Sequence, residues 1–245
     1  MSAKSEMGMT VPLLKSILMA GLLATGSIQS HAQGTIQFQN LDFENAVTVP
    51  IPGDPLQRIQ FAPAFPGWVG YAGTNEQGAA LYNTQTAGSV ALGLAGPGWS
   101  DAVHPIIEGN YSAVLQAGYN GIERVPAIMA QTALIPTSAL TLRVKASPLT
   151  GGEFSTLDVA VSGQSLSLSP LATTPAYILY AGDISAFAGQ VREIRFSAVP
   201  TARYAFSGFL IDSISFSDQS IPEPNTIVLF GLAGLSFLCR RGKQD

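Results

Sequence analysis

Apolar and polar residues alternate along several short segments in the middle of the chain. The clearest case is 140–145, which reads LTLRVK, and 211–216, which reads IDSISF, nearly repeats it. A period of two residues is typical of a β-strand with one face in a core and the other in water. No long stretch of the middle part keeps a helical period, so the pattern predicts an all-β fold.

Short apolar, β-branched or aromatic runs, separated by Gly, Pro, Ser and Asn, predict many strands. They are 35–39, 67–71, 79–82, 89–93, 111–117, 127–135, 139–146, 156–162, 164–169, 176–181, 193–198 and 209–216. Ser162, Gly163 and Gln164 predict a tight turn, and 185–189 predicts a single helical turn closed by Gly189. Many short strands with regular breaks favour a β-sandwich of two antiparallel sheets over residues 33–220.

A different pattern ends the chain. Residues 226–239 form an uncharged apolar run, preceded by Ile221-Pro222-Glu223-Pro224 and followed by Arg240, Arg241 and Lys243. As a helix the run covers about 21 Å, which is short for a bilayer core of about 30 Å. It can still cross a thin or locally compressed membrane, with Arg240 and Arg241 extending to the headgroups. The positive-inside tendency places the basic cluster in the cytoplasm and the main domain outside it.

This order of motif, apolar helix and basic cluster resembles the PEP-CTERM sorting signal of exported Gram-negative proteins, over residues 221–245. The resemblance implies that a membrane enzyme of the exosortase type cuts near Pro222, Glu223 and Pro224. It also implies delivery to the cell surface or the extracellular polysaccharide. In that interpretation the three motif residues, with Arg240 and Arg241, are recognised rather than catalytic. The alternative is a permanent tail anchor, in which the prolines only end the folded domain.

The amino-terminal residues predict export as well. Lys4 and Lys15 precede the apolar residues 17–24, and Ser30-His31-Ala32 follows with small residues at its first and third positions. This is the pattern of a secretory signal peptide, so we expect 1–32 to be removed by cleavage after Ala32. An uncleaved anchor helix is the alternative, but the apolar run is short and its end is polar.

Charge and cysteine content narrow the class of protein further. Residues 33–224 hold seven Lys and Arg against fourteen Asp and Glu, a net charge of about minus seven. An acidic surface of this kind argues against binding to nucleic acid or to anionic lipid. The only cysteine is Cys239, so the exported domain has no disulfide and depends on core packing or on a metal ion.

Three segments resemble the galactose-binding-like jelly-roll fold. Residues 180–196 resemble a strand–loop–strand passage of that family, 209–216 resembles its last strand, and Asn40–Asn45 resembles its first. The resemblance implies a jelly-roll sandwich whose first and last strands lie side by side. With the two terminal signals, the expected organisation is a signal peptide, a sandwich ectodomain, and a sorting signal with a short transmembrane helix over 226–239.

Carbohydrate is the first candidate ligand, because jelly rolls of this kind often bind sugars. Exposed tryptophan and tyrosine rings suit the apolar faces of pyranoses. The candidates lie in glycine-rich surroundings typical of loops; they are Trp68, Tyr71, Trp99 and Tyr119. For the two tryptophans the alternative is that they fill the core of the sandwich.

A structural calcium ion is the second candidate. The jelly-roll resemblance implies that Asp42 and Glu44 lie beside Asp212, and such oxygen ligands suit Ca²⁺. The family commonly has two consecutive acids in its last strand, whereas Ser213 follows Asp212 here. The alternative is that these carboxylates are simply solvated.

Catalysis has the least support. The domain after Ala32 has one histidine, His104, which would have to meet a serine and Asp101 or another acid. Neither Gly-x-Ser-x-Gly nor His-Glu-x-x-His occurs. We therefore expect an exported, non-enzymatic surface or matrix protein associated with exopolysaccharide. A carbohydrate-binding module and a secreted glycoside hydrolase remain the alternatives, the last because two carboxylates can meet only in the fold.

Overall fold

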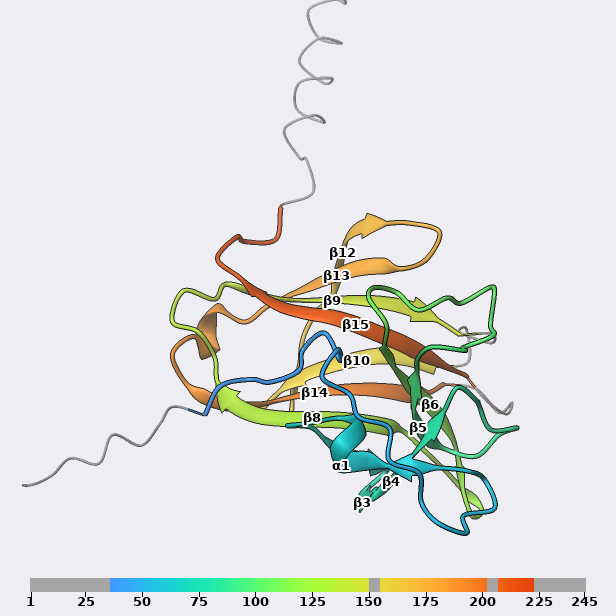
Figure 1. Cartoon of the computed structure of the whole chain (residues 1–245). Coiled ribbons are helices and arrows are strands. Elements are labelled where there is room, and N and C mark those ends of the chain that lie inside the picture. The colour runs from blue at the N-terminus through green and yellow to red at the C-terminus, as the bar shows by residue number, and fades with distance from the viewer. Residues whose placement is uncertain (1–35, 150–154, 202–206, 223–245) are drawn as a thin grey trace, which may run out of the picture. The chain divides into compact units, whose positions relative to one another are not determined.

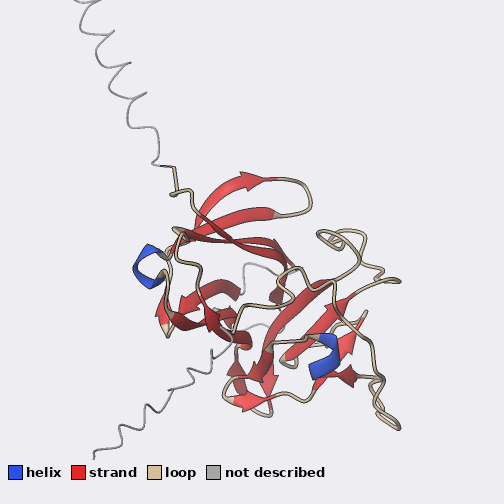
Figure 2. Cartoon of the chain, turned by 60° about the vertical axis from the view of Figure 1, so that its left-hand side comes forward, coloured by secondary structure: helices blue, strands red, loops and turns tan. Residues whose placement is uncertain are grey.

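Two β-sheets face each other in the computed structural model, which describes residues 36–149, 155–201 and 207–222 (Figure 1; Figure 2). Strands make up nearly all the regular structure. The helical elements are the single turns α1 (Phe61–Ala64) and η2 (Ser185–Phe187) within the described ranges. The predicted β-sandwich is therefore confirmed for this part of the chain.

The larger sheet has nine strands among the described residues. Its order is β1-β4-β5-β6-β15-β9-β13-β12, and β7 pairs with β6. Their bounds are β1 (Ile59–Gln60), β4 (Ala79–Tyr82), β5 (Ala91–Ala95), β6 (Ser112–Asn120), β7 (Glu123–Val125), β9 (Thr141–Pro148), β12 (Ser169–Thr173), β13 (Ile178–Asp183) and β15 (Ser207–Ser217). The pair β4–β5 is parallel, so the expectation of two purely antiparallel sheets was wrong for this edge.

The smaller sheet is antiparallel in each of its described pairs. Its order is β11-β10-β14-β8-β2-β3. The bounds are β2 (Val69–Ala72), β3 (Asn75–Glu76), β8 (Ala127–Leu134), β10 (Ser155–Val161), β11 (Gln164–Ser165) and β14 (Val191–Pro200).

The core between the sheets follows from the alternation in the sequence. In β9, Leu142, Val144 and Ala146 are buried against the facing sheet, whereas Arg143 and Lys145 lie on the outer face and are partly exposed. Burying one face of each strand in this way stabilises the sandwich through removal of apolar area from water, at about 25 cal/mol per Å².

Two turn predictions are confirmed. Ser162 and Gly163 both have positive φ (48° and 80°), and the strands that they join meet at Val161 and Gln164, as a two-residue hairpin requires. After η2, Gly189 has φ of 72°, the left-handed conformation that closes a helical turn.

The first predicted strands were wrong. Residues 36–39 form no strand, although the Leu134 N–H donates to Ile36 O at 2.8 Å. Asn40–Asn45 is a series of turns, because Asn40 and Phe43 have positive φ (49° and 59°) and the Asn40 side chain accepts a hydrogen bond from Asn45 N–H. This segment does lie beside the last strand, since the Ile214 N–H donates to Leu41 O at 2.9 Å.

Candidate functional site

A buried polar site lies on the outer face of the larger sheet, away from the main core. There the loop 96–111, between β5 and β6, lies over strand residues that would otherwise face water. Its apolar residues Trp99, Ile106 and Ile107 pack on a small buried cluster formed by Ala95, Val114, Leu149 and Leu210. The loop thereby gives this face a second, smaller core.

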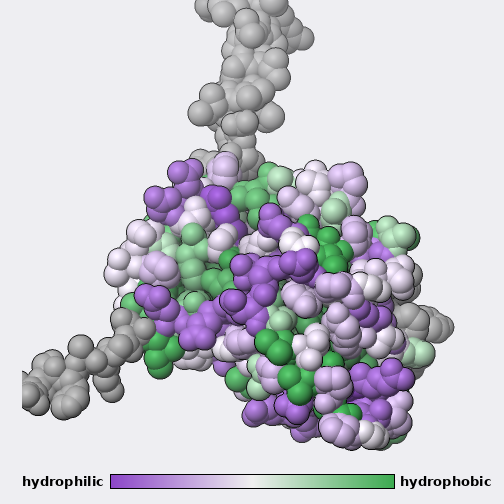
Figure 3. All heavy atoms as spheres, viewed as in Figure 1, coloured by the Kyte–Doolittle hydropathy of each residue, from purple (hydrophilic) through white to green (hydrophobic). Residues whose placement is uncertain are grey.

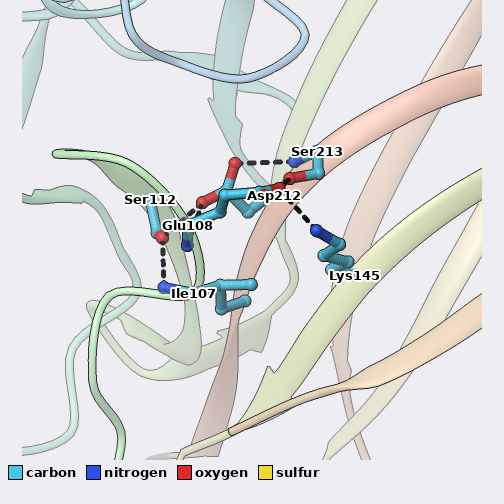
Figure 4. A network of polar contacts seen from close by, with 6 residues as sticks. All are labelled: Ile107, Glu108, Ser112, Lys145, Asp212 and Ser213. Carbon is cyan, nitrogen blue, oxygen red and sulfur yellow. Dashed lines mark hydrogen bonds and ion pairs between the residues drawn. The ribbon is translucent and has the colours of Figure 1, made fainter. Parts of the chain in front are cut away.

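Asp212 is the buried acid of this site, only 1% exposed (Figure 4). Its Oδ2 accepts hydrogen bonds from Ser112 Oγ at 2.7 Å and from Glu108 N–H at 3.3 Å. Its Oδ1 accepts a hydrogen bond from the N–H of the next residue on its own strand, Ser213, at 2.6 Å. Ser213 has φ of 47° and lies where the β15–β9 register shifts, so a β-bulge aims its N–H at the carboxylate.

The loop is fastened at both sides of Asp212. Glu108 accepts hydrogen bonds from Lys145 Nζ and Ser213 Oγ, each at 2.5 Å. Glu44 accepts hydrogen bonds from Asn110 N–H at 2.8 Å and Tyr111 N–H at 2.9 Å. Strand and turn segments that are distant in sequence are thereby joined to one loop.

The charges of the site follow from these contacts. Burial raises the pKa of Asp212 to about 7, against the opposing effect of its hydrogen bonds, and the negative charge of Glu44 raises it further. The hydrogen bond from Lys145 lowers the pKa of Glu108 below its usual value. The site therefore contains one carboxyl group that changes charge near neutral pH and one that stays ionised.

The calcium candidates lie close in the fold without forming one ligand group. Asp42 is exposed and accepts a hydrogen bond from Glu44 N–H, Glu44 binds the loop backbone, and Asp212 is buried. No cluster of three or more Asp, Glu, His or Cys side chains suited to a metal ion occurs among the residues that the structure describes. The three carboxylates instead make hydrogen bonds within the protein, and calcium binding stays a prediction.

The four aromatic candidates are not brought together into one platform. Trp68 is 4% exposed and packs between Phe43 and Phe196, with its Nε1 donating to Asn40 O, so it fills the core. Trp99, in the loop 96–111, is half-buried against the small cluster beneath the loop, and its Nε1 donates to His104 O.

The two tyrosines lie apart from each other and from Trp99. Tyr71 is on β2 of the smaller sheet, where the Arg195 guanidinium lies 5.9 Å from the ring centroid. Tyr119, near the end of β6, is 37% exposed. Of the four, Tyr119 has the ring that is most open to a ligand.

Asp101 and His104 do meet, which is one of the two contacts that a Ser-His-Asp arrangement would need. His104 Nδ1 lies 2.8 Å from Asp101 Oδ2, while Asp101 Oδ1 accepts hydrogen bonds from the N–H groups of Val103 and His104. Burial by itself would raise the pKa of Asp101, but the hydrogen bonds with His104 outweigh this effect and lower the pKa below its usual value. This pair closes a surface turn of the covering loop.

The sorting motif begins where the fold ends. The Leu140 N–H donates to Ser217 O at 2.8 Å, and Thr141 Oγ1 donates to Gln219 O at 3.0 Å. Ser220 and Ile221 then line a depression of about 220 Å³ beside Leu140. The described chain stops at Pro222, so the other predicted sorting residues (Glu223, Pro224, Arg240 and Arg241), the helix 226–239 and the signal peptide with Ala32 lie outside it.

The membrane prediction concerns residues outside the described ranges. Within residues 36–149, 155–201 and 207–222, no helix has the length and apolar character needed to cross a bilayer.

Sequence reasoning missed Glu108, Ser112 and Lys145 as members of the site. Lys145 and Ser112 lie in predicted strands, and Glu108 lies shortly after a proline in a stretch without clear pattern. One signal was available in the sequence. Lys145 and Asp212 are polar residues that alternate with core residues in two strands, so both were expected on the outer face of the sheet.

No protein-family model matches the chain, and no curated protein matches it. Among solved structures, a cyclase from Fischerella sp. TAU in complex with 4-(1H-indol-3-yl)butan-2-one is 16% identical, with a TM-score of 0.40 over 76% of this chain and 99% of that one.

Two further structures are similar at lower TM-scores. An apo form of a cyclase from Fischerella sp. is 15% identical, with a TM-score of 0.37 over 76% of this chain and 98% of that one. An α-L-rhamnosidase from Dictyoglumus thermophilum is 13% identical, with a TM-score of 0.25 over 62% of this chain and 15% of that one. At such TM-scores we infer no activity from these likenesses.

Proposed function

We propose that this chain is an exported, non-enzymatic protein of the cell surface or extracellular matrix. An exosortase-type membrane enzyme recognises its tail, and the processed protein associates with extracellular polysaccharide. Before processing, the chain is held by the helix 226–239 with its ectodomain on the periplasmic side of the inner membrane. The ectodomain is a jelly-roll sandwich of the galactose-binding-like kind.

The position of the motif relative to the fold is the observation that carries the proposal. Hydrogen bonding to β9 holds the chain as far as Gln219, and Pro222 follows three residues later. Pro222 comes five residues after the end of β15, and the two prolines of the motif favour an extended segment that an enzyme can bind. The described strands do not include the motif, so cleavage there leaves the β-sandwich whole.

The sorting proposal is tested by changing Glu223 to Ala in the full chain, in a Gram-negative host that has an exosortase. Asp218→Ala is the matched control, because Asp218 is an exposed acid five residues earlier and outside the motif. We expect the Glu223→Ala protein to keep its tail mass and to stay in the membrane, while the Asp218→Ala protein is processed like the parent. Deletion of Arg240 and Arg241 is expected to have the same effect as Glu223→Ala. Normal mature mass and surface delivery in the motif variants would refute the sorting role.

Association with polysaccharide is tested separately. Tyr119 offers the most exposed of the predicted aromatic rings, and rings of this kind pack on sugar faces. We expect Tyr119→Ala to weaken retention of the mature protein on the producing cell's own polysaccharide, with Tyr82→Ala as a control tyrosine away from that site. Equal retention of the parent and both variants would refute the sugar contact by Tyr119.

A further inference from the structure

Both ends of the described chain lie at one end of the sandwich. The Leu134 N–H, at the end of β8, donates to Ile36 O, and the Leu140 N–H, just before β9, donates to Ser217 O, both at 2.8 Å. The β8–β9 corner thus holds the first described residue and the end of β15. In Figure 1 the blue start and the red end of the coloured ribbon both lie toward the left.

An apolar groove of about 300 Å³ opens at this end. Its lining has no charged side chain and consists of Gln37, Phe38, Leu41, Leu134, Pro136 and Phe216. The rings of Phe38 and Phe216 lie 5.1 Å apart between centroids. Figure 3 shows some hydrophobic residues toward the left of the viewed face, among others that are scattered over it.

Three exposed aliphatic side chains belong to residues next to those that line the groove. Ile36 is 65% exposed, Val191 is 55% exposed and Leu140 is 39% exposed. Val191 is the ladder partner of the groove residue Leu134, and the Leu134 N–H bonds to Ile36 O. The Leu140 N–H bonds to Ser217 O, next to the groove residue Phe216. Contiguous apolar surface of this kind marks sites of contact with proteins or membranes.

The short chain between the sandwich and the apolar run favours the membrane as the partner. Gln219 is the last residue hydrogen-bonded to β9, and the apolar run begins at Thr226. Seven residue steps span at most about 25 Å. If the run lies in the bilayer, as the proposed function requires, the exit end of the sandwich stays within that distance of the lipid surface.

We propose that the groove and the neighbouring Ile36, Val191 and Leu140 rest on the bilayer while the tail is still attached. The inference depends on the proposed anchoring of the tail. A zwitterionic surface fits best, because the domain is acidic overall and an anionic surface would repel it. The exposed charges near this end, Asp183, Arg192 and Asp218, include a single cation.

The experiment uses the full chain in phosphatidylcholine vesicles that carry a quencher at the headgroup depth. In a Cys239→Ser background, one protein carries a fluorophore at Val191→Cys and a second carries it at Ile122→Cys. Ile122 is 94% exposed in the β6–β7 turn. Ile122 lies at the opposite end of the sandwich from the tail. Ala117, near the end of β6, pairs with Ser207 at the start of β15, whereas the tail leaves from the end of β15, ten residues and about 30 Å further along the strand.

We expect the lipid quencher to reduce fluorescence at position 191 and to leave position 122 unchanged. With the label at 191, Ile36→Asp is expected to abolish the quenching, because it puts a charge into the contact. Val47→Asp is the matched control, since Val47 is 58% exposed and its N–H bonds to Pro63 O in α1, away from the groove.

The outcomes separate this inference from the anchoring on which it rests. If the protein floats with the vesicles and position 191 is no more quenched than position 122, the membrane contact is refuted while the anchor stands. Quenching at 191 that Ile36→Asp leaves unchanged also refutes the apolar contact. If the parent does not float with the vesicles, the anchoring itself fails.

Discussion

Asp212 lies directly opposite Lys145 across β15 and β9, yet the Lys145 ammonium group binds Glu108 instead. Asp212 is left with hydrogen bonds from Ser112, Ser213 and the Glu108 backbone. Within the described residues its carboxylate has no ion pair, although it is almost fully buried. The electrostatic cost of a buried, unpaired charge is what raises its pKa to about 7.

The first prediction concerns pH and stability. The unfolded chain ionises Asp212 near its ordinary pKa of 3.8, whereas the folded protein keeps the proton until about pH 7. Stability contributed by this group is therefore full below pH 4, falls as pH rises, and is gone above pH 7. Between pH 5 and pH 8 we expect the free energy of unfolding to fall by up to about 3 kcal/mol.

Urea unfolding at the two pH values measures this change. Asp212→Asn removes the titration, so its free energy of unfolding should be nearly equal at pH 5 and pH 8. Asp42→Asn is the control, because Asp42 is exposed, and it should keep the parent's pH dependence. A parent protein as stable at pH 8 as at pH 5 would contradict the prediction.

Gln131 is expected to hold the start of the described chain in place. Its amide forms a bidentate pair with the backbone of Gln39, accepting from Gln39 N–H at 2.5 Å and donating to Gln39 O at 3.0 Å. Gln131 is 5% exposed, so its removal leaves buried backbone groups without partners, at a cost of about 1–3 kcal/mol. Gln131→Ala should lower the free energy of unfolding by this amount, and Gln164→Ala, at an exposed position in β11, should change it little.

The two tryptophans are predicted to differ in what they stabilise. Trp68 lies among Phe43 and Phe196 in the main core, so Trp68→Ala should cost about 3–5 kcal/mol. Trp99 belongs to the loop 96–111 and is half-buried against the small cluster, so Trp99→Ala should cost less and loosen mainly that loop. Urea unfolding gives both costs, and amide hydrogen exchange locates the second effect. Equal costs would show that the loop is as essential as the core.

Much of the fold could be predicted because period-two patterns are local. The strands β4, β6, β8, β9, β10, β14 and β15 coincide closely with predicted ranges. Prediction failed where strands are too short to carry a pattern, as in β1 and β3, which have two residues each. Asn40–Asn45 failed for another reason: the jelly-roll resemblance implied a strand there, but asparagine turn chemistry prevailed.

The candidate site could be predicted only in part, because its contacts are distant in sequence. Asp212 was identifiable as a polar residue among apolar ones in the last strand. Its partner Ser112 is 100 residues away, and Glu108 lies in a loop whose path over the sheet has no periodic signal. No local pattern indicates that Lys145 pairs with Glu108 rather than with the acid opposite it.

The last prediction isolates the fastening of the loop by Glu44. Gly109 has φ of 62°, and a Cβ there would collide with the Glu44 carboxylate that binds Asn110 and Tyr111. Gly121 has nearly the same φ, 65°, but has open space around it. Alanine at either position costs about 1 kcal/mol of backbone strain, so any further loss in Gly109→Ala measures the displaced Glu44 contacts. We expect Gly109→Ala to be the less stable by urea unfolding, with faster amide exchange at Asn110 and Tyr111, and equal losses in the two variants would show that Glu44 does not hold the loop.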